Sequence, residues 1–307
     1  MDFELDAEQQ AVLDAVATLV ERHAGAERAR ELAAKAEYDF ALERALDDAG
    51  FLAVASQAGP LEAVLVVEAV ARGAGATAIA AGALVAPLVA ERALPSPVAL
   101  ASASGRGPVR YAAHARTLLV EDGDEARVVA LQAGDAEPVA SSYGYPMGRP
   151  APSVLEGGES LGPGSGERLR RWWRVALAAE TVGTLAASLA VTLDHVKARR
   201  QFGRAIGSFQ AVQHRLAECA IGTQAARWLA YEAAWQGAPA EGAALAAAHA
   251  THTAERVFAE THQLSGAIGY THEHPLHVFS MRLPALRAEA GGVAAHRRAA
   301  ARARWPS

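Results

Sequence analysis

The sequence predicts a mainly α-helical protein with a small β insert, and three observations along the chain lead to this fold class. Residues 1–94 alternate helical patterns with short breaks. Residues 95–165 place Pro and Gly between short β-type runs, which is typical of a small β domain. Residues 166–307 return to apolar positions at helical spacing over long stretches. We therefore expect an N-terminal α-helical domain, a truncated middle β domain with a linker, and a C-terminal four-helix bundle.

The first region contains three helices whose ends can be read from the sequence. Asp6 can cap the first helix, because its carboxylate accepts hydrogen bonds from free backbone N–H groups. The second helix covers about Phe40–Ala49 and ends at Gly50, a residue type that is common just after a helix. The third begins near Pro60, since proline is well tolerated in a first helical turn.

The middle region predicts short strands and a linker. Thr117–Glu121 and Arg127–Leu131 are β-type runs between glycines. The stretch GGESLGPGSG at 157–166 is rich in Gly and Ser, which predicts a linker before the last region.

The last region predicts four helices. One runs from about Glu167 through Lys197, and the others cover about Phe209–Trp235, Ala240–Gln263 and Pro275–Ala290. Their outer faces carry few charges. Such helices are mostly buried in a bundle or lie at a subunit interface.

Charge and cysteine content narrow the possible functions. The formal net charge of −5 gives no reason to expect nucleic acid or an anionic membrane as a partner. The single cysteine, Cys219, excludes an internal disulfide and is expected to be buried. With no signal-peptide pattern at the start, this predicts a cytoplasmic protein. The apolar tracts Ala74–Ala90 and Ala238–Ala250 are interrupted by Gly, Pro, Glu or His, so we expect packed helices and no membrane span.

Histidines and tryptophans near the C-terminus do not form a recognisable site. The histidines match no HExxH or Cys/His zinc pattern, so we expect surface or interface side chains and no metal. The tryptophans lie in apolar helical runs and are interpreted as packing residues. The histidines are His249, His252, His272, His274 and His277, and the tryptophans are Trp172, Trp173, Trp228 and Trp235.

Two motifs in the last region carry a resemblance. The first reads Arg-Arg-Gln-Phe-Gly at 199–203 and continues with Phe-Gln at 209–210. The second reads Gln-Leu-Ser-Gly at 263–266 and continues as Gly-Tyr-Thr-His-Glu-His-Pro at 269–275. At this spacing the pair resembles the C-terminal motifs of the acyl-CoA dehydrogenase family. The resemblance is strong over 167–289, fair over 1–90 and weak over 95–165.

The resemblance implies FAD as the cofactor, contacted across an interface and held chiefly by a neighbouring subunit. The Arg199 guanidinium suits a pyrophosphate, because it offers a rigid fork of charged donors. Phe202 offers an apolar ring, and Gly266 lets backbone approach closely. As alternatives, Arg199 is an ordinary cation at a helix end and Phe202 is a core residue. The cofactor-binding residues carried over are Arg199, Gln201, Phe202, Gln210, Gln263 and Gly266.

The family's catalytic base has no counterpart at its usual positions. Members remove an α-proton from an acyl-CoA with a glutamate while flavin N5 takes the β-hydride. At family spacing the base position is Ala290, and the position that a minority of members use is Trp173. Neither residue can take a proton. Glu289 is one residue off and should point elsewhere if it lies on a helix, and Glu167 lies about two turns too early.

These features together predict a base-lacking subunit of an FAD-dependent acyl-CoA dehydrogenase. Residues 98–158 lack the family's Thr-Glu-Pro…Gly-Ser-Asp loop and its Trp-Ile-(Ser/Thr)-Asn strand, so we expect this chain's own flavin site to be lost. The chain resembles actinobacterial, steroid-type enzymes in which two unlike subunits form an α2β2 heterotetramer. The partner would supply the base and hold most of the acyl-CoA, and an electron-transfer flavoprotein or similar protein would accept electrons. The alternatives are a self-sufficient homo-oligomer using Glu289 or Glu167, and a non-catalytic helical scaffold.

Overall fold

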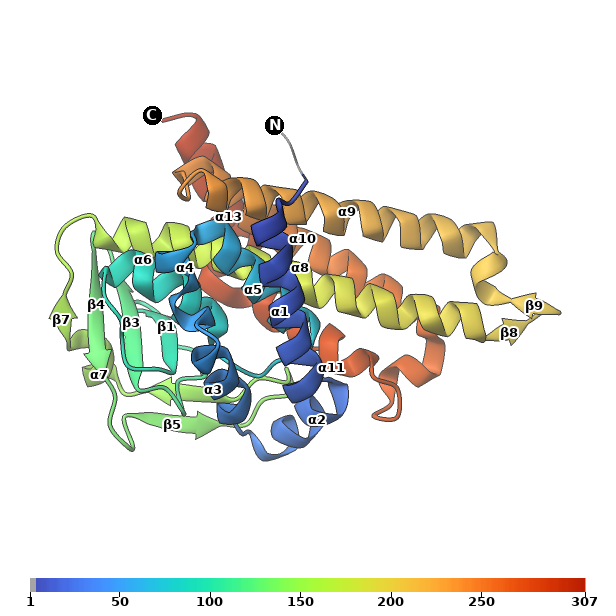
Figure 1. Cartoon of the computed structure of the whole chain (residues 1–307), viewed down its shortest axis with the longest axis horizontal. Coiled ribbons are helices and arrows are strands. Elements are labelled where there is room, and N and C mark those ends of the chain that lie inside the picture. Colours follow the sequence, from blue (N-terminus) through green and yellow to red (C-terminus); the bar gives the residue numbers. More distant parts are fainter. Residues whose placement is uncertain (1–3, 307) are drawn as a thin grey trace.

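The predicted order of helical, β and helical regions is confirmed in the computed structural model of the chain (Figure 1), which describes residues 4–306. Short helices and the strands lie toward one end of the long axis, and the bundle extends to the other (Figure 1). The N-terminal helices are α1 (Ala7–His23), α2 (Ala26–Lys35), α3 (Phe40–Asp48), α4 (Val54–Gln57), α5 (Pro60–Arg72) and α6 (Ala86–Ala90). A 3-10 turn at Phe51–Ala53 precedes α4, and a π-helical segment at Ala80–Val85 precedes α6.

The predicted helix ends in this region are confirmed. The Asp6 carboxylate accepts a hydrogen bond from the Gln9 backbone N–H at 2.8 Å, and the Gln9 side chain accepts one from the Asp6 backbone at 3.1 Å. Gly50 follows α3 with φ 83°, a backbone conformation that glycine adopts without strain. Pro60 is the first residue of α5. Helix α2 was not predicted, because it is largely polar and buries only Ala29 and Leu32.

The middle region forms two small sheets. The first has the order β1 (Val98–Ser102), β3 (Thr117–Asp122), β4 (Glu125–Ala130) and β7 (Glu159–Ser160), with β1 parallel to β3 and the other pairs antiparallel. The second is antiparallel, with the order β2 (Val109–Arg110), β6 (Met147–Pro150) and β5 (Ala136–Val139). A short helix, α7 (Pro152–Glu156), follows β6.

The predicted linker at residues 157–166 has an ordered structure and joins the strands to the bundle. This segment contains β7, which pairs with β4, and the start of the first bundle helix. Gly166 packs so closely on the turn between β3 and β4 that an added Cβ would lie 2.4 Å from the Gly123 carbonyl oxygen. A side chain at position 166 would therefore clash with this turn, which explains the glycine there.

The C-terminal region is a bundle of long helices. These are α8 (Ser165–Ala198), α9 (Gln210–Trp235) and α10 (Ala240–Ser265), and a two-stranded hairpin of β8 (Arg200–Gln201) and β9 (Arg204–Ala205) follows α8. Beyond α10 the chain forms 3-10 turns at Gly266–Tyr270 and Glu289–Gly291 and the helices α11 (Leu276–Ser280), α12 (Arg282–Ala288) and α13 (Gly292–Arg304).

The prediction of a single fourth helix over Pro275–Ala290 is wrong. That segment is divided into α11 and α12, and the helix that packs along α10 is α13. The chain leaves α12 at Ala288, and Ala290, Gly291 and Gly292 then have φ values of 50°, 87° and 73°. Consecutive residues in this conformation cannot continue a right-handed helix.

One large hydrophobic core joins the first and last regions. It includes Val16 of α1, Leu65 of α5 and Val182 of α8, all with no exposed surface. The strands add a smaller cluster around Leu118 and Val120. By length and composition α8 could cross a membrane, but 78% of its most apolar window is buried inside the protein, as in a core helix.

Candidate functional site

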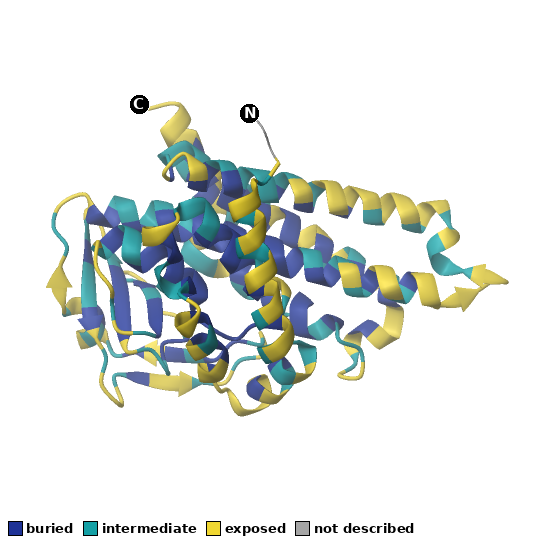
Figure 2. Cartoon of the chain, in the orientation of Figure 1, coloured by how far each residue is buried: buried dark blue, intermediate teal, exposed yellow. Residues whose placement is uncertain are grey.

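The predicted cofactor-binding residues lie together at the free end of the bundle, which we call the tip. The chain direction reverses between α8 and α9 and again between α9 and α10, so the end of α8, the start of α9 and the end of α10 meet there (Figure 1). All six predicted residues are exposed, and the tip as a whole is among the most exposed parts of the bundle (Figure 2). They are Arg199, Gln201, Phe202, Gln210, Gln263 and Gly266.

The polar groups of the tip are open to a ligand. Arg199 is the residue that ends α8, and its guanidinium has no hydrogen bond or ion pair with any residue between 4 and 306. Burial lowers the pKa of the nearby His195, and the positive charge of Arg199 lowers it further. Gly266 ends α10 with φ 64°, and an added Cβ would meet nothing within 4 Å. An unpaired guanidinium beside open backbone fits the pyrophosphate of a dinucleotide.

Phe202 is not a core residue. Its side chain is 89% exposed at the turn of the β8–β9 hairpin, where Phe202 has φ 52° and Gly203 has φ 80°. A bulky residue at positive φ is strained, and a large exposed ring gains nothing from burial within this chain. The alternative that Phe202 serves the chain's own core is therefore wrong.

A second candidate region lies near the other end of α8. It is a groove of about 1030 Å³ between the strands, the start of α8 and the turn after α12. Both expected base positions, Ala290 and Trp173, line it, although they are distant in sequence. Trp173 lies 26 residues before Arg199 on α8, so at 1.5 Å per residue the groove and the tip are about 39 Å apart. One chain therefore cannot bring its tip to its own groove.

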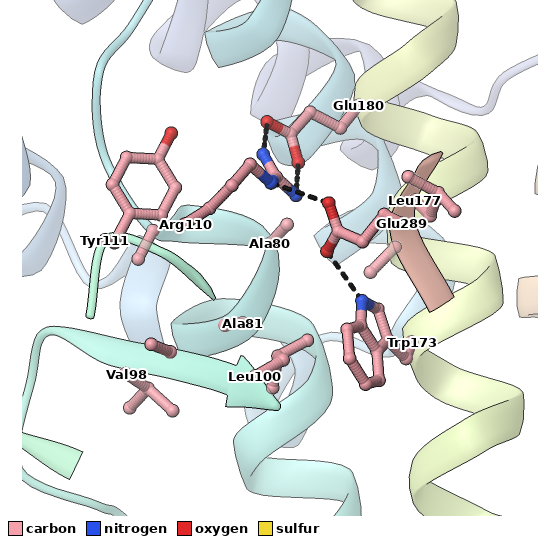
Figure 3. A pocket seen from close by; sticks show the side chains of 13 residues that line it. Ala80, Ala81, Val98, Leu100, Arg110, Tyr111, Trp173, Leu177, Glu180 and Glu289 are labelled. Atoms are coloured by element: carbon pink, nitrogen blue, oxygen red, sulfur yellow. Dashed lines mark hydrogen bonds and ion pairs between the residues drawn. The ribbon is translucent and has the colours of Figure 1, made fainter. Parts of the chain in front are cut away.

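Glu289 lies in this groove, contrary to the expectation that it points elsewhere. Its Oε1 accepts a hydrogen bond from Trp173 Nε1–H at 2.7 Å, and its Oε2 accepts one from Arg110 Nε–H at 2.6 Å (Figure 3). The expectation assumed a continuous helix, in which one residue means a rotation of about 100°. Because α12 ends at Ala288 and Glu289 is extended with ψ 152°, that rotation does not apply.

Arg110 joins Glu289 to a second buried carboxylate. Its Nη1 and Nη2 donate to the two oxygens of Glu180 on α8 at 2.6 and 2.9 Å, and the Tyr145 hydroxyl donates to Glu180 Oε1 at 3.0 Å. The guanidinium carbon lies 4.7 Å from the centre of the Tyr145 ring. Burial alone lowers the pKa of Arg110, but Glu180 and Glu289 outweigh it and hold the pKa well above its usual value. Arg110 is thus a fixed cation between two carboxylates (Figure 3).

Arg110, Glu180 and Tyr145 were not predicted as site residues. Glu180 carried a usable signal, because it is the one charge in the run Val175–Leu185. A charged residue at a helix position that faces the core is rarely buried unless it is paired. Arg110 and Tyr145 lie in short irregular stretches where the sequence shows no such contrast.

Glu167 does not face the groove. Its carboxylate accepts hydrogen bonds from Arg170 Nη2 at 2.9 Å and from Arg171 Nε at 3.0 Å, and it is not among the residues that line the groove. Burial raises the pKa of Glu167, but these two arginines outweigh it and lower the pKa overall. A carboxylate that two arginines hold ionised, and that does not line the groove, is badly placed to take a substrate proton.

Cys219 and the tryptophans take no part in the tip or the groove, except for Trp173, and one of the tryptophans differs from its predicted role. Cys219 is buried, and burial together with Glu260 raises the pKa of its thiol to about 11. Within residues 4–306 no group of three or more metal-binding side chains comes together. Trp172 and Trp173 are buried, as expected, but the interpretation of Trp235 as a packing residue is wrong, because it is 67% exposed.

Comparisons with known proteins agree on one family. Residues 170–304 match the family model described as acyl-CoA dehydrogenase, C-terminal domain. The chain is 32% identical over 304 residues to acyl-CoA dehydrogenase IpdE2 of Mycobacterium tuberculosis, covering 90% of each protein. A chain in the ChsE4-ChsE5 complex from Mycobacterium tuberculosis is 25% identical with a TM-score of 0.84 over 100% of both chains. A chain of a Tcur3481-Tcur3483 steroid ACAD variant shares the fold, with 24% identity and a TM-score of 0.82 over 96% of this chain and 97% of that chain.

Proposed function

Because the chain belongs to the acyl-CoA dehydrogenase family, we propose that it is the base-lacking subunit of a hetero-oligomeric enzyme of this family. The family's enzymes are oxidoreductases that act on CH–CH groups. The partner subunit would carry the glutamate base, the isoalloxazine site and most of the acyl-CoA. This chain would complete the partner's site by binding the polar part of FAD through Arg199, Gln201, Phe202, Gln210, Gln263 and Gly266. When bound, FAD would accept the hydride from the β-carbon of the CoA thioester.

The position of the tip is the observation that carries this proposal. An unpaired guanidinium, exposed amides and an open glycine gather about 39 Å from the chain's own groove, as estimated from the helical rise of α8. Dinucleotide-binding groups that lie this far from their own chain's groove would serve a flavin held by another subunit. The expected base positions, Ala290 and Trp173, offer the groove no proton acceptor.

The finer parts of the proposal follow the resemblance. We infer an α2β2 heterotetramer in the cytoplasm, with an electron-transfer flavoprotein or similar acceptor. The similarity to one chain of a two-protein complex over its full length supports an unlike partner. We infer a CoA thioester of a steroid side chain as substrate, and the fold shared with a steroid ACAD is consistent with that choice.

A self-sufficient enzyme that uses Glu289 is the second candidate, because the Glu289 carboxylate lines the groove. Against it, both oxygens are already held by Arg110 and Trp173, and an ion-paired carboxylate is a weak general base. Glu167, the other substitute, lies outside the groove.

Co-expression with candidate catalytic subunits tests the proposal. We expect a stable complex that carries about one FAD for each pair of unlike subunits and dehydrogenates an acyl-CoA, while the lone chain does neither. FAD and turnover in the lone chain would favour the self-sufficient enzyme. A complex whose flavin content is unchanged by this chain would favour a helical scaffold.

A further inference from the structure

Two N–H donors from different elements converge on one carboxylate at the inner end of the groove. Arg110 lies on β2 and Trp173 lies on α8. Each donates a hydrogen bond to a different oxygen of Glu289, at 2.6 and 2.7 Å respectively (Figure 3). Two donors spaced for the two oxygens of one carboxyl group form a receptor for a carboxylate of any origin.

This receptor is held in place without Glu289. Glu180 binds Nη1 and Nη2 of Arg110, which leaves Nε–H as the donor directed at the groove. Glu180 is itself fixed by the Tyr145 hydroxyl, and the Tyr145 ring packs on the guanidinium. Trp173, on α8, is buried, with only 6% of its surface exposed. The donor geometry is thus preorganised, which favours binding because little order has to be imposed on the site.

Glu289, in contrast, lies at the start of the turn between α12 and α13. It is the first residue after α12, and the next three residues, Ala290 to Gly292, all have positive φ. Ala290 has a Cβ and is strained in this conformation. Glycines at the two following positions let the turn change its dihedral angles at low cost. The Glu289 side chain can therefore leave the receptor without moving α8 or the strands.

The groove in front of the receptor attracts anions. Five arginines line it against two glutamates, in a chain whose formal net charge is −5. The guanidinium groups of Arg106, Arg149 and Arg174 have no hydrogen bond or ion pair with any residue that the structure describes. Burial lowers the pKa of Arg174 even though Glu167 and Glu121 act to raise it, so a ligand carboxylate beside this half-buried cation would be stabilising. Leu100, Val109 and Met147 add apolar surface between the charged groups.

We propose that Arg110 and Trp173 form a binding site for an organic carboxylate, which Glu289 occupies as an internal ligand until an external one displaces it. The groove favours a short-chain dicarboxylate, whose second carboxylate reaches Arg174 or Arg149 while its methylene chain lies on the apolar wall. This site is at the other end of the molecule from the tip, so it does not depend on the flavin contacts proposed above.

Calorimetric titration of the full-length chain with adipate and hexanoate tests the site, at ionic strength held constant with NaCl. Both acids have six carbons, so they differ only in the second carboxylate. We expect Glu289→Ala to bind adipate at least about tenfold more tightly than the wild type, because the internal competitor is gone. Adding Arg110→Met to that variant should weaken adipate roughly ten- to a hundredfold, the value of a charge-assisted hydrogen bond. Arg149→Ala combined with Arg174→Ala should weaken adipate but not hexanoate.

A second measurement locates binding in the wild type. The indole N–H signal of Trp173, identified by its loss in Trp173→Phe, should shift as adipate is added. Where Glu289→Ala does not fold, Glu289→Gln takes its place, since the amide keeps an acceptor for Trp173 and loses the charge. Three results would overturn the proposal. The first is that adipate binds the Glu289 variant no more strongly than NaCl does at the same ionic strength. The others are that Arg110→Met leaves adipate binding unchanged, or that adipate does not shift the Trp173 indole signal in the wild type.

Discussion

Arg199→Ala removes the one unpaired guanidinium that the FAD motif places at the tip. In the complex with the catalytic subunit, Arg199 is proposed to donate charge-assisted hydrogen bonds to the FAD pyrophosphate, and such a bond contributes about 1.5–3 kcal/mol. The dissociation constant for FAD should therefore rise roughly ten- to a hundredfold. No bond within this chain is lost, because the Arg199 side chain has no partner among the described residues, so thermal stability should not change.

Flavin fluorescence titration of the wild-type and variant complexes measures this change directly. Arg200→Ala is the matched control, because Arg200 is the neighbouring exposed arginine and its Nη2 donates to the Gly203 carbonyl oxygen of its own hairpin at 3.4 Å. Excess FAD should restore most of kcat to Arg199→Ala, which it could not do for a residue that acts in the chemical step. FAD binding as tight as wild type in Arg199→Ala would refute the transfer of the motif to this chain and favour the scaffold alternative.

Three further outcomes test the groove and the core. We expect kcat of the complex to change by less than about threefold when Glu289→Gln or Glu167→Gln is introduced. Loss of a real general base costs at least about a hundredfold in kcat. A drop of that size in steady-state assays would favour the self-sufficient enzyme. Arg110→Met should destabilise the chain by about 3–5 kcal/mol, because it leaves the buried Glu180 and the half-buried Glu289 without a counter-ion, and the Tm should fall by roughly 10 °C. Calorimetry that finds no change would mean that the network does not stabilise the fold. Burial, aided by the charge of Arg174, lowers the pKa of His296 from 6.5 to about 4. As the pH falls, this histidine is therefore protonated in the unfolded state before it is protonated in the folded state. The folded state should lose stability between about pH 6.5 and about pH 4 for this reason. Denaturant unfolding of His296→Phe should show a flatter pH dependence over that range, and an unchanged slope would assign the effect to other groups.

Local signals account for most of the fold that could be predicted. The cap at Asp6, the stop at Gly50 and the start at Pro60 depend on residues within one turn of the helix end, so the sequence alone is enough. The break after Ala288 also had a local signal, in the pair Gly291-Gly292, but the apolar pattern of the segment before it concealed that α12 ends early.

The candidate site divides in the same way. The tip residues belong to two motifs on helices whose order fixes where their ends meet, so their gathering at one end follows from the sequence. The groove network does not follow from it, because Arg110, Glu180 and Glu289 come from three separate elements and meet only after folding. The one-residue offset of Glu289 was misjudged because a side-chain direction was inferred for a helix that ends one residue earlier.

The flavin content of the lone chain, compared with that of its complex, decides whether the flavin site is shared between two unlike subunits. We expect little or no FAD and no acyl-CoA dehydrogenation in the lone chain, because its tip and its groove are about 39 Å apart and Ala290 and Trp173 replace the base. We expect about one FAD for each pair of unlike subunits, with turnover, once the catalytic subunit is present. Stoichiometric FAD together with turnover in the lone chain would mean that the chain forms a complete flavin site without an unlike partner.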